Sequence, residues 1–68
     1  MRTVLHLVRP AAEAALPPVV AERDWVVYLQ PMRLVHGGAP HTAPFPPGSL
    51  DHDQVVALVF AADLVVTW

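Results

Sequence analysis

Apolar residues fall in runs along this chain, and the runs predict its strands. Residues 3–8 and 25–29 are apolar almost throughout, which is typical of strands buried on both faces of a sheet. A third run of this kind, Leu64 to Val66, is rich in β-branched residues and follows Asp63. The pattern therefore predicts three interior strands rather than strands with one solvent-exposed face.

A helix is predicted between Asp51 and Asp63. Asp51 followed by Gln54 three positions later forms a capping-box pattern, and Leu50 and Val55 flank it as a hydrophobic staple. Every residue from Val55 to Ala62 is apolar. A helix that is apolar all round has to be covered on more than one side.

A second helix is predicted within residues 11–23, which are rich in helix formers. Pro17 and Pro18 interrupt this stretch, and each removes a backbone amide donor. Either the helix kinks there, or it begins near Leu16, so that both prolines occupy the first turn. We favour the second alternative, because first-turn amides have no partner within the helix.

Residues 31–49 are predicted to be irregular. All three glycines and most of the eight prolines of the chain lie in this segment. Such a composition argues against a regular helix or an interior strand. Met32 to Val35 is expected to add one helical turn, and Ala43 to Pro47 is expected to run as polyproline II.

The order of these elements predicts the fold. Strand, helix, strand, irregular segment, helix and strand imply right-handed crossovers between parallel strands. We therefore expect a single α/β domain over residues 1–68, with a three-stranded parallel sheet in the order 2-1-3 and flanking helices.

The high content of apolar residues in so short a chain predicts an oligomer. The chain has 68 residues, of which 54% are hydrophobic, and its mean hydropathy is +0.43. A domain of this size hides only about 60% of the surface of its unfolded chain. We expect the apolar surface that one such domain cannot bury to be covered by a partner. The predicted interface residues are Val55, Val56, Val59, Phe60, Trp25 and Trp68.

Composition also excludes several classes of function. The chain has no cysteine, which excludes a disulfide scaffold, a thiolate metal site and a persulfide carrier. Its four basic residues are spread along the chain and its net charge is −2, so direct nucleic-acid binding is not expected. The apolar runs are too short to cross a bilayer, and the first residues lack a signal-peptide pattern. We therefore expect a cytoplasmic protein.

Histidines are the candidate ligands for a metal ion or a small molecule. His36, His41 and His52, together with Asp51 and Asp53, supply nitrogen and oxygen atoms of the kind that bind zinc. Their spacing matches no metal motif. The sequence favours solvated histidines and carboxylates that serve the helix N-terminus, with no metal and no cofactor.

His6 lies alone in the first strand, where it could act as a general acid or base. A hydrogen-bonded histidine within the core or an interface is the favoured interpretation. Gly37 and Gly38 could let the backbone approach an anion, but a turn is favoured. Ser49 has no neighbouring base at a recognisable spacing, so we do not expect an enzyme.

Both ends of the chain resemble one family. Its opening strand reads Leu5-His6-Leu7-Val8, and its second strand ends in Tyr28-Leu29-Gln30. Residues 50–56 read Leu-Asp-His-Asp-Gln-Val-Val, and Trp68 follows the last strand. These segments are similar to the DsrE/DsrF/DsrH-like proteins, and most similar to the DsrH/TusB branch.

The resemblance implies a truncated DsrE-like fold, homo-oligomers or hetero-oligomers with cysteine-bearing DsrE/DsrF-like subunits, and a place in sulfur relay. That relay serves tRNA 2-thiouridylation or sulfur oxidation. This chain departs from the family where Gln30 is followed by Pro31-Met32, and in having no cysteine. We therefore expect a non-catalytic subunit. The alternative is a small-ligand or metal-binding module that uses His6, His36, His41 and His52.

Overall fold

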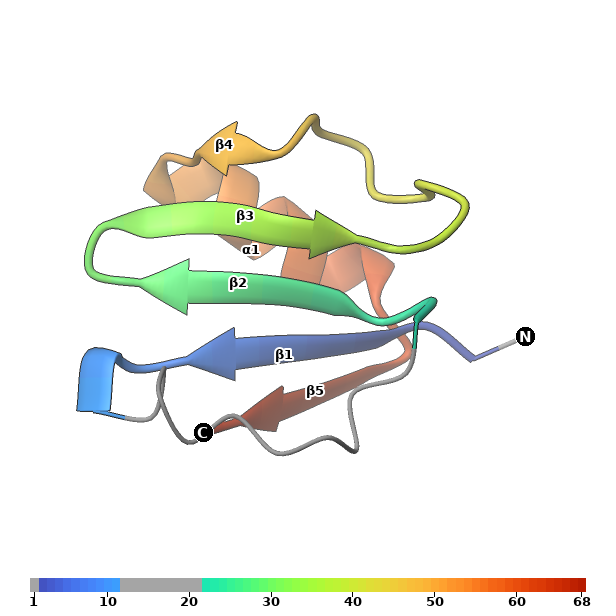
Figure 1. Ribbon diagram of the computed structural model, residues 1–68, viewed down its shortest axis with the longest axis horizontal. Helices are drawn as coiled ribbons and strands as arrows, with labels where there is room; N and C mark the ends of the chain where they lie inside the picture. Colours follow the sequence, from blue (N-terminus) through green and yellow to red (C-terminus); the bar gives the residue numbers. More distant parts are fainter. Residues whose placement is uncertain (1, 12–21) are drawn as a thin grey trace.

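One mixed sheet and one helix make up the described part of the chain, residues 2–11 and 22–68 of a computed structural model (Figure 1). The strands, in chain order, are β1 (Val4–Val8), β2 (Trp25–Leu29), β3 (Met32–Gly37), β4 (Gly48–Ser49) and β5 (Leu64–Thr67). The helix α1 spans His52–Ala61. The strands form a five-stranded sheet in the order β4-β3-β2-β1-β5.

The α/β class and the position of β1 between the other two predicted strands are confirmed. β1 pairs in parallel with β2 on one side and with β5 on the other. These are the three predicted strands, in the predicted order, but the expectation of an interior strand is wrong for β5, which lies at the edge of the sheet with Leu64 exposed. The expected size of the sheet is wrong, because β3 and β4 add two antiparallel strands beside β2 and make the sheet mixed.

β3 corrects the expectation for residues 31–49, where one helical turn and otherwise irregular structure were predicted. Residues 32–37 instead pair with β2 across a tight turn at Gln30 and Pro31. Proline interrupts a strand by removing a ladder donor, but Pro31 lies before the strand and removes none from it. The helix expected within residues 11–23 falls largely on positions outside the described residues.

The start of α1 follows the predicted capping box. The Asp51 carboxylate accepts a hydrogen bond from the Gln54 amide at 2.8 Å, and the Gln54 side-chain oxygen accepts one from the Asp51 amide at 2.9 Å. The helix ends at Ala61, and Asp63 then accepts a hydrogen bond from the Thr3 amide at 2.7 Å. The chain thus leaves the helix next to β1, which it joins as β5.

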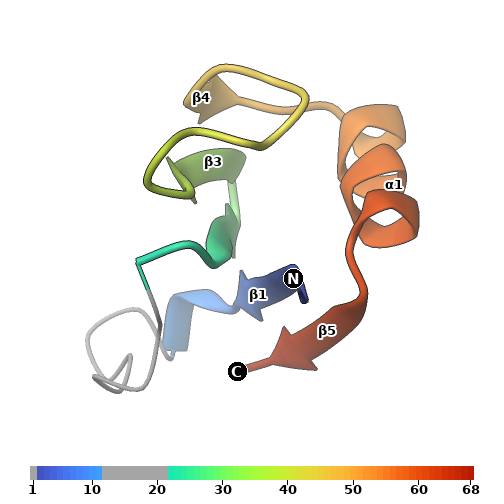
Figure 2. The same ribbon diagram turned by 90° about the vertical axis from the view of Figure 1, so that its right-hand side faces the viewer.

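The core lies between α1 and one face of the sheet (Figure 2). Its buried members come from the strands, the loop before α1 and the helix itself: Leu5, Trp25, Val27, Leu34, Ala43, Leu50, Val55 and Leu58. From α1 only Val55 and Leu58 are buried. Within one chain the helix is therefore covered on one side, although its composition predicts cover on more.

Candidate functional site

A buried polar network lies on the face of the sheet opposite α1, centred on His6. Leu5 points into the core under α1, so the alternation of a strand turns His6 to the other face. His6 Nε2 lies 2.8 Å from Asp24 Oδ2, and the two residues are 4% and 5% exposed. On the other side, Trp68 Nε1 donates a hydrogen bond to His6 Nδ1 at 3.0 Å.

The register of the parallel strands explains how this network forms. Leu5 is paired with Trp25, so Asp24, one residue earlier, is level with Val4 and shares the face of His6. Leu7 is paired with Thr67, so Trp68 is level with Val8 on that same face. His6 therefore has diagonal neighbours on both adjacent strands, within reach of long side chains.

The two contacts fix the tautomer of His6. An indole nitrogen only donates, so His6 Nδ1 has to accept and carries no proton. The proton of the neutral ring then lies on Nε2, which donates to the Asp24 carboxylate. Both ring nitrogens are occupied, which confirms the favoured interpretation of His6 as a hydrogen-bonded core histidine.

The predicted loop histidines do not converge. His36 Nδ1 donates to the Asp24 carbonyl at 2.8 Å, and His41 Nε2 donates to the Phe45 carbonyl at 2.8 Å. His52 is exposed at the first position of α1. Over residues 2–11 and 22–68, no group of three or more histidine, cysteine or acidic side chains is placed to hold a metal ion. The geometry therefore gives the metal-binding alternative no support.

A turn begins at Gly38, directly after Gly37 ends β3, which agrees with the turn favoured from the sequence. Gly38 has a φ of +96°, and the Thr42 amide donates to the Gly37 carbonyl at 2.9 Å. The Trp25 indole nitrogen donates to Thr42 Oγ1 at 3.0 Å, which ties this loop to β2. The contacts of residues 37–42 thus hold this loop against the sheet.

The predicted interface residues separate into two groups. Val55 and Trp25 belong to the core, and Trp68 belongs to the His6 network. The other three share an exposed side of α1: Val56, Val59 and Phe60. We call these three residues the outer stripe. Phe60 is 84% exposed, the most of any large apolar residue in the described part of the chain.

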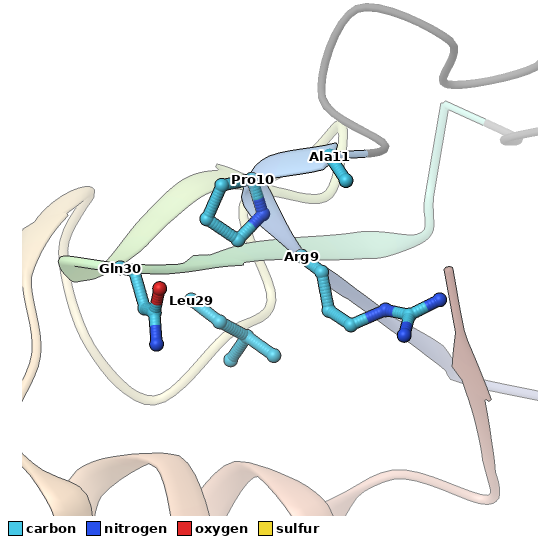
Figure 3. Close-up of a pocket in the computed structure, with 5 residues that line it drawn as sticks. All are labelled: Arg9, Pro10, Ala11, Leu29 and Gln30. Carbon is cyan, nitrogen blue, oxygen red and sulfur yellow. The ribbon is translucent and has the colours of Figure 1, made fainter.

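A pocket of about 430 Å³ opens at the carboxyl ends of β1 and β2 (Figure 3). The described residues that line it are Arg9, Pro10, Ala11, Leu29 and Gln30. None of them was predicted as a site residue. Arg9 and Gln30 each follow directly on a strand, and that position was the available signal.

Asp24 was also missed as a partner of His6. The signal for it was an acidic residue placed immediately before an all-apolar strand. Such a carboxylate is drawn into the sheet and needs a buried donor nearby. Only the strand register shows that Asp24 lies next to His6 on the neighbouring strand, and local sequence does not supply that register.

Comparison with models of protein families, with curated proteins and with solved structures found no match. Among the described residues, no helix has the length and apolar character needed to cross a membrane.

Proposed function

We propose that this chain is a non-catalytic subunit that assembles through the outer stripe of α1, as a cytoplasmic counterpart of the DsrH/TusB component of a sulfur-relay complex. The observation that carries the proposal is the exposure of Phe60 on a helix that Val55 and Leu58 already anchor to the core. A surface phenylalanine contributes nothing to the packing of its own subunit.

The chemistry of the outer stripe favours an apolar partner. Its three residues recur at spacings of three and four and therefore lie along one side of the helix. No charged side chain occurs between Asp53 and Asp63, so the stripe has no charge along most of its length. Burying a valine or phenylalanine side chain stabilises a complex by roughly 1.5 to 3 kcal/mol before the costs of association.

A second copy of the chain fits this surface. Two copies of α1 packed antiparallel about a two-fold axis would place Phe60 of one against Val56 of the other, and such an interface is complementary to itself. A helix of ten residues is only about 15 Å long. The contact is therefore smaller than a standard interface, and we expect dissociation at micromolar concentrations.

The sulfur-relay part of the proposal rests on the family resemblance of the sequence. A small α/β sheet in which β1 lies between two parallel neighbours is consistent with that resemblance. Because the chain has no cysteine, it cannot carry a persulfide itself. Its role would be to hold cysteine-bearing DsrE/DsrF-like subunits in a complex, through the same apolar stripe.

Sedimentation equilibrium of three chains tests the assembly. The wild type is expected to associate, and Phe60→Lys is expected to remain at the 7.4 kDa mass of one chain. Lysine is tolerated there because the last turn of α1 has no basic residue and the helix dipole favours one. Ala57→Lys, at an exposed position beside the stripe, is the matched control and should still associate. A wild type that stays monomeric up to the concentrations used for NMR would contradict the proposal.

A further inference from the structure

The pocket at the carboxyl ends of β1 and β2 carries an inference that goes beyond assembly. In open sheets with parallel strands, ligands bind just beyond the carboxyl ends of those strands. β1, β2 and β5 run in parallel, so their carboxyl ends share one edge of the sheet (Figure 1). The pocket volume of about 430 Å³ lies within the range of small-molecule sites.

Arg9 is held in place at this edge through its Nε atom. Arg9 Nε donates to the main-chain oxygen of Trp68 at 2.8 Å, which directs the guanidinium group toward β5 (Figure 3). No partner for Nη1 or Nη2 occurs among residues 2–11 and 22–68. Two parallel N–H donors of one guanidinium match the two oxygens of a carboxylate or phosphate.

Among the described residues, the rest of the lining is apolar except for one amide. Pro10 and Leu29 present hydrocarbon, and the Gln30 side chain adds a donor and an acceptor. In Figure 3, Leu29 lies between the Gln30 amide and the Arg9 guanidinium. A ligand lying along Leu29 would thus meet a cation at one end and an amide at the other.

The charge of the lining selects the sign of the ligand. Arg9 is the charged side chain among the described residues that line the pocket, and no acidic residue occurs with it. The acidic residues near the parallel strands, Asp24 and Asp63, precede β2 and β5 and so belong to the opposite edge of the sheet. A positive group therefore stands at this edge in a chain whose net charge is −2.

We infer that this pocket binds a small organic anion, in which a carboxylate or phosphate group meets Arg9 Nη1 and Nη2 and an apolar body covers Leu29 and Pro10. The anionic group forms charge-assisted hydrogen bonds with the guanidinium. The Gln30 amide binds a polar group at the far end. The pocket residues are separate from the outer stripe, so ligand binding and assembly can fail independently.

NMR titration of the folded chain tests this site with three probes: hexanoate, inorganic phosphate and hexan-1-ol. Hexanoate has both the anion and the apolar body and is expected to give saturable shifts at Arg9 Nε, Ala11 and the Gln30 side-chain amide. Phosphate, which lacks the body, should bind more weakly at the same residues. Hexan-1-ol lacks the anion and should bind at least about tenfold more weakly than hexanoate, since hydrogen bonds to charged groups are the stronger class.

Arg9→Gln is expected to weaken hexanoate binding by about tenfold or more. Arg2→Gln changes the net charge equally at an exposed residue outside the pocket and should leave binding unchanged. Arg9→Lys keeps the charge without the two-pronged donor and should bind at an intermediate level, which provides a second variant if Arg9→Gln does not fold. Non-saturable shifts, shifts that map away from the pocket, or equal binding of hexanoate and hexan-1-ol would overturn the inference.

Discussion

Leu58 and Phe60 are two positions apart on α1 and have opposite surroundings. Leu58 is fully buried against the sheet at 0% exposure, whereas Phe60 is 84% exposed. Leu58 belongs to an inner stripe with Val55, and Phe60 belongs to the outer stripe with Val56 and Val59. Both stripes are apolar, but only the inner one is explained by the core of a single chain.

This difference distinguishes two reasons why a position on α1 is apolar. The inner stripe supplies the buried apolar surface that holds α1 on the sheet. Its loss should therefore lower the free energy of unfolding. The outer stripe adds less to that packing, and Phe60 adds least, so the loss of Phe60 should mainly weaken the association with a second molecule. Substitutions on the two stripes should therefore move different observables, and the following predictions run from the largest expected change in stability to the smallest.

Leu58→Ala should lower the free energy of unfolding by roughly 2 to 5 kcal/mol, since it opens a cavity beneath the helix. Urea denaturation followed by circular dichroism measures the loss. The control is Val59→Ala on the outer stripe, which should cost less because Val59 is 37% exposed and a valine loses fewer carbons than a leucine. Equal losses in the two variants would break the distinction between the stripes.

Trp68→Phe should cost about 1 to 2 kcal/mol, because His6 Nδ1 loses its donor in a buried setting. Assembly should not change, since Trp68 lies on the sheet face opposite α1. Nitrogen-15 NMR of the wild-type imidazole checks the basis of this prediction and should show the Nε2–H tautomer of His6. An Nδ1–H tautomer would show that the indole does not donate to His6.

Asp51→Ala should cost about 1 kcal/mol, because it removes the carboxylate that accepts the hydrogen bond from the Gln54 amide, while the bond from the residue 51 amide to the Gln54 side chain can remain. The end of α1 that carries Val56 would fray, so association should weaken together with stability. Thermal unfolding and sedimentation of the same sample measure the two effects. Asp53→Ala leaves the capping box intact and should change both less.

Phe60→Lys should leave the stability of the monomer almost unchanged, since the replaced ring is exposed. Its effect should appear in the concentration dependence of the melting temperature. The wild type should melt at a higher temperature as concentration rises, because association stabilises the folded state. For Phe60→Lys that dependence should vanish, and its persistence would show that association uses another surface.

The sequence was informative where the determinants are local. The capping box of Asp51 and Gln54 involves residues three apart, and the structure contains both of its hydrogen bonds. The apolar runs of β1, β2 and β5 predicted parallel strands in their observed order, although β5 lies at the edge of the sheet. These signals need no knowledge of which distant residues meet.

The sequence was misleading at β3, because the proline and glycine content of residues 31–49 outweighed the strand residues within it. Pro31 and Gly37 mark the two ends of the strand and do not interrupt it. β3 is stabilised by pairing with β2, a tertiary effect that overrides composition.

Sites that depend on register or on strand ends could not be assembled from spacing alone. His6 and Asp24 are 18 positions apart, and His6 and Trp68 are 62 apart. Arg9 and Gln30 line one pocket because two parallel strands end at the same edge. In both cases the sequence contains the residues, but only the pairing of β1 with its neighbours brings them together.

The most direct test of assembly through α1 is an isotope-filtered NOE experiment on an equal mixture of labelled and unlabelled chains. Such a spectrum reports only contacts between two molecules. The account predicts intermolecular NOEs between the Phe60 ring and the Val56 methyl groups. A spectrum without intermolecular NOEs, or with NOEs confined to the strands, would contradict it.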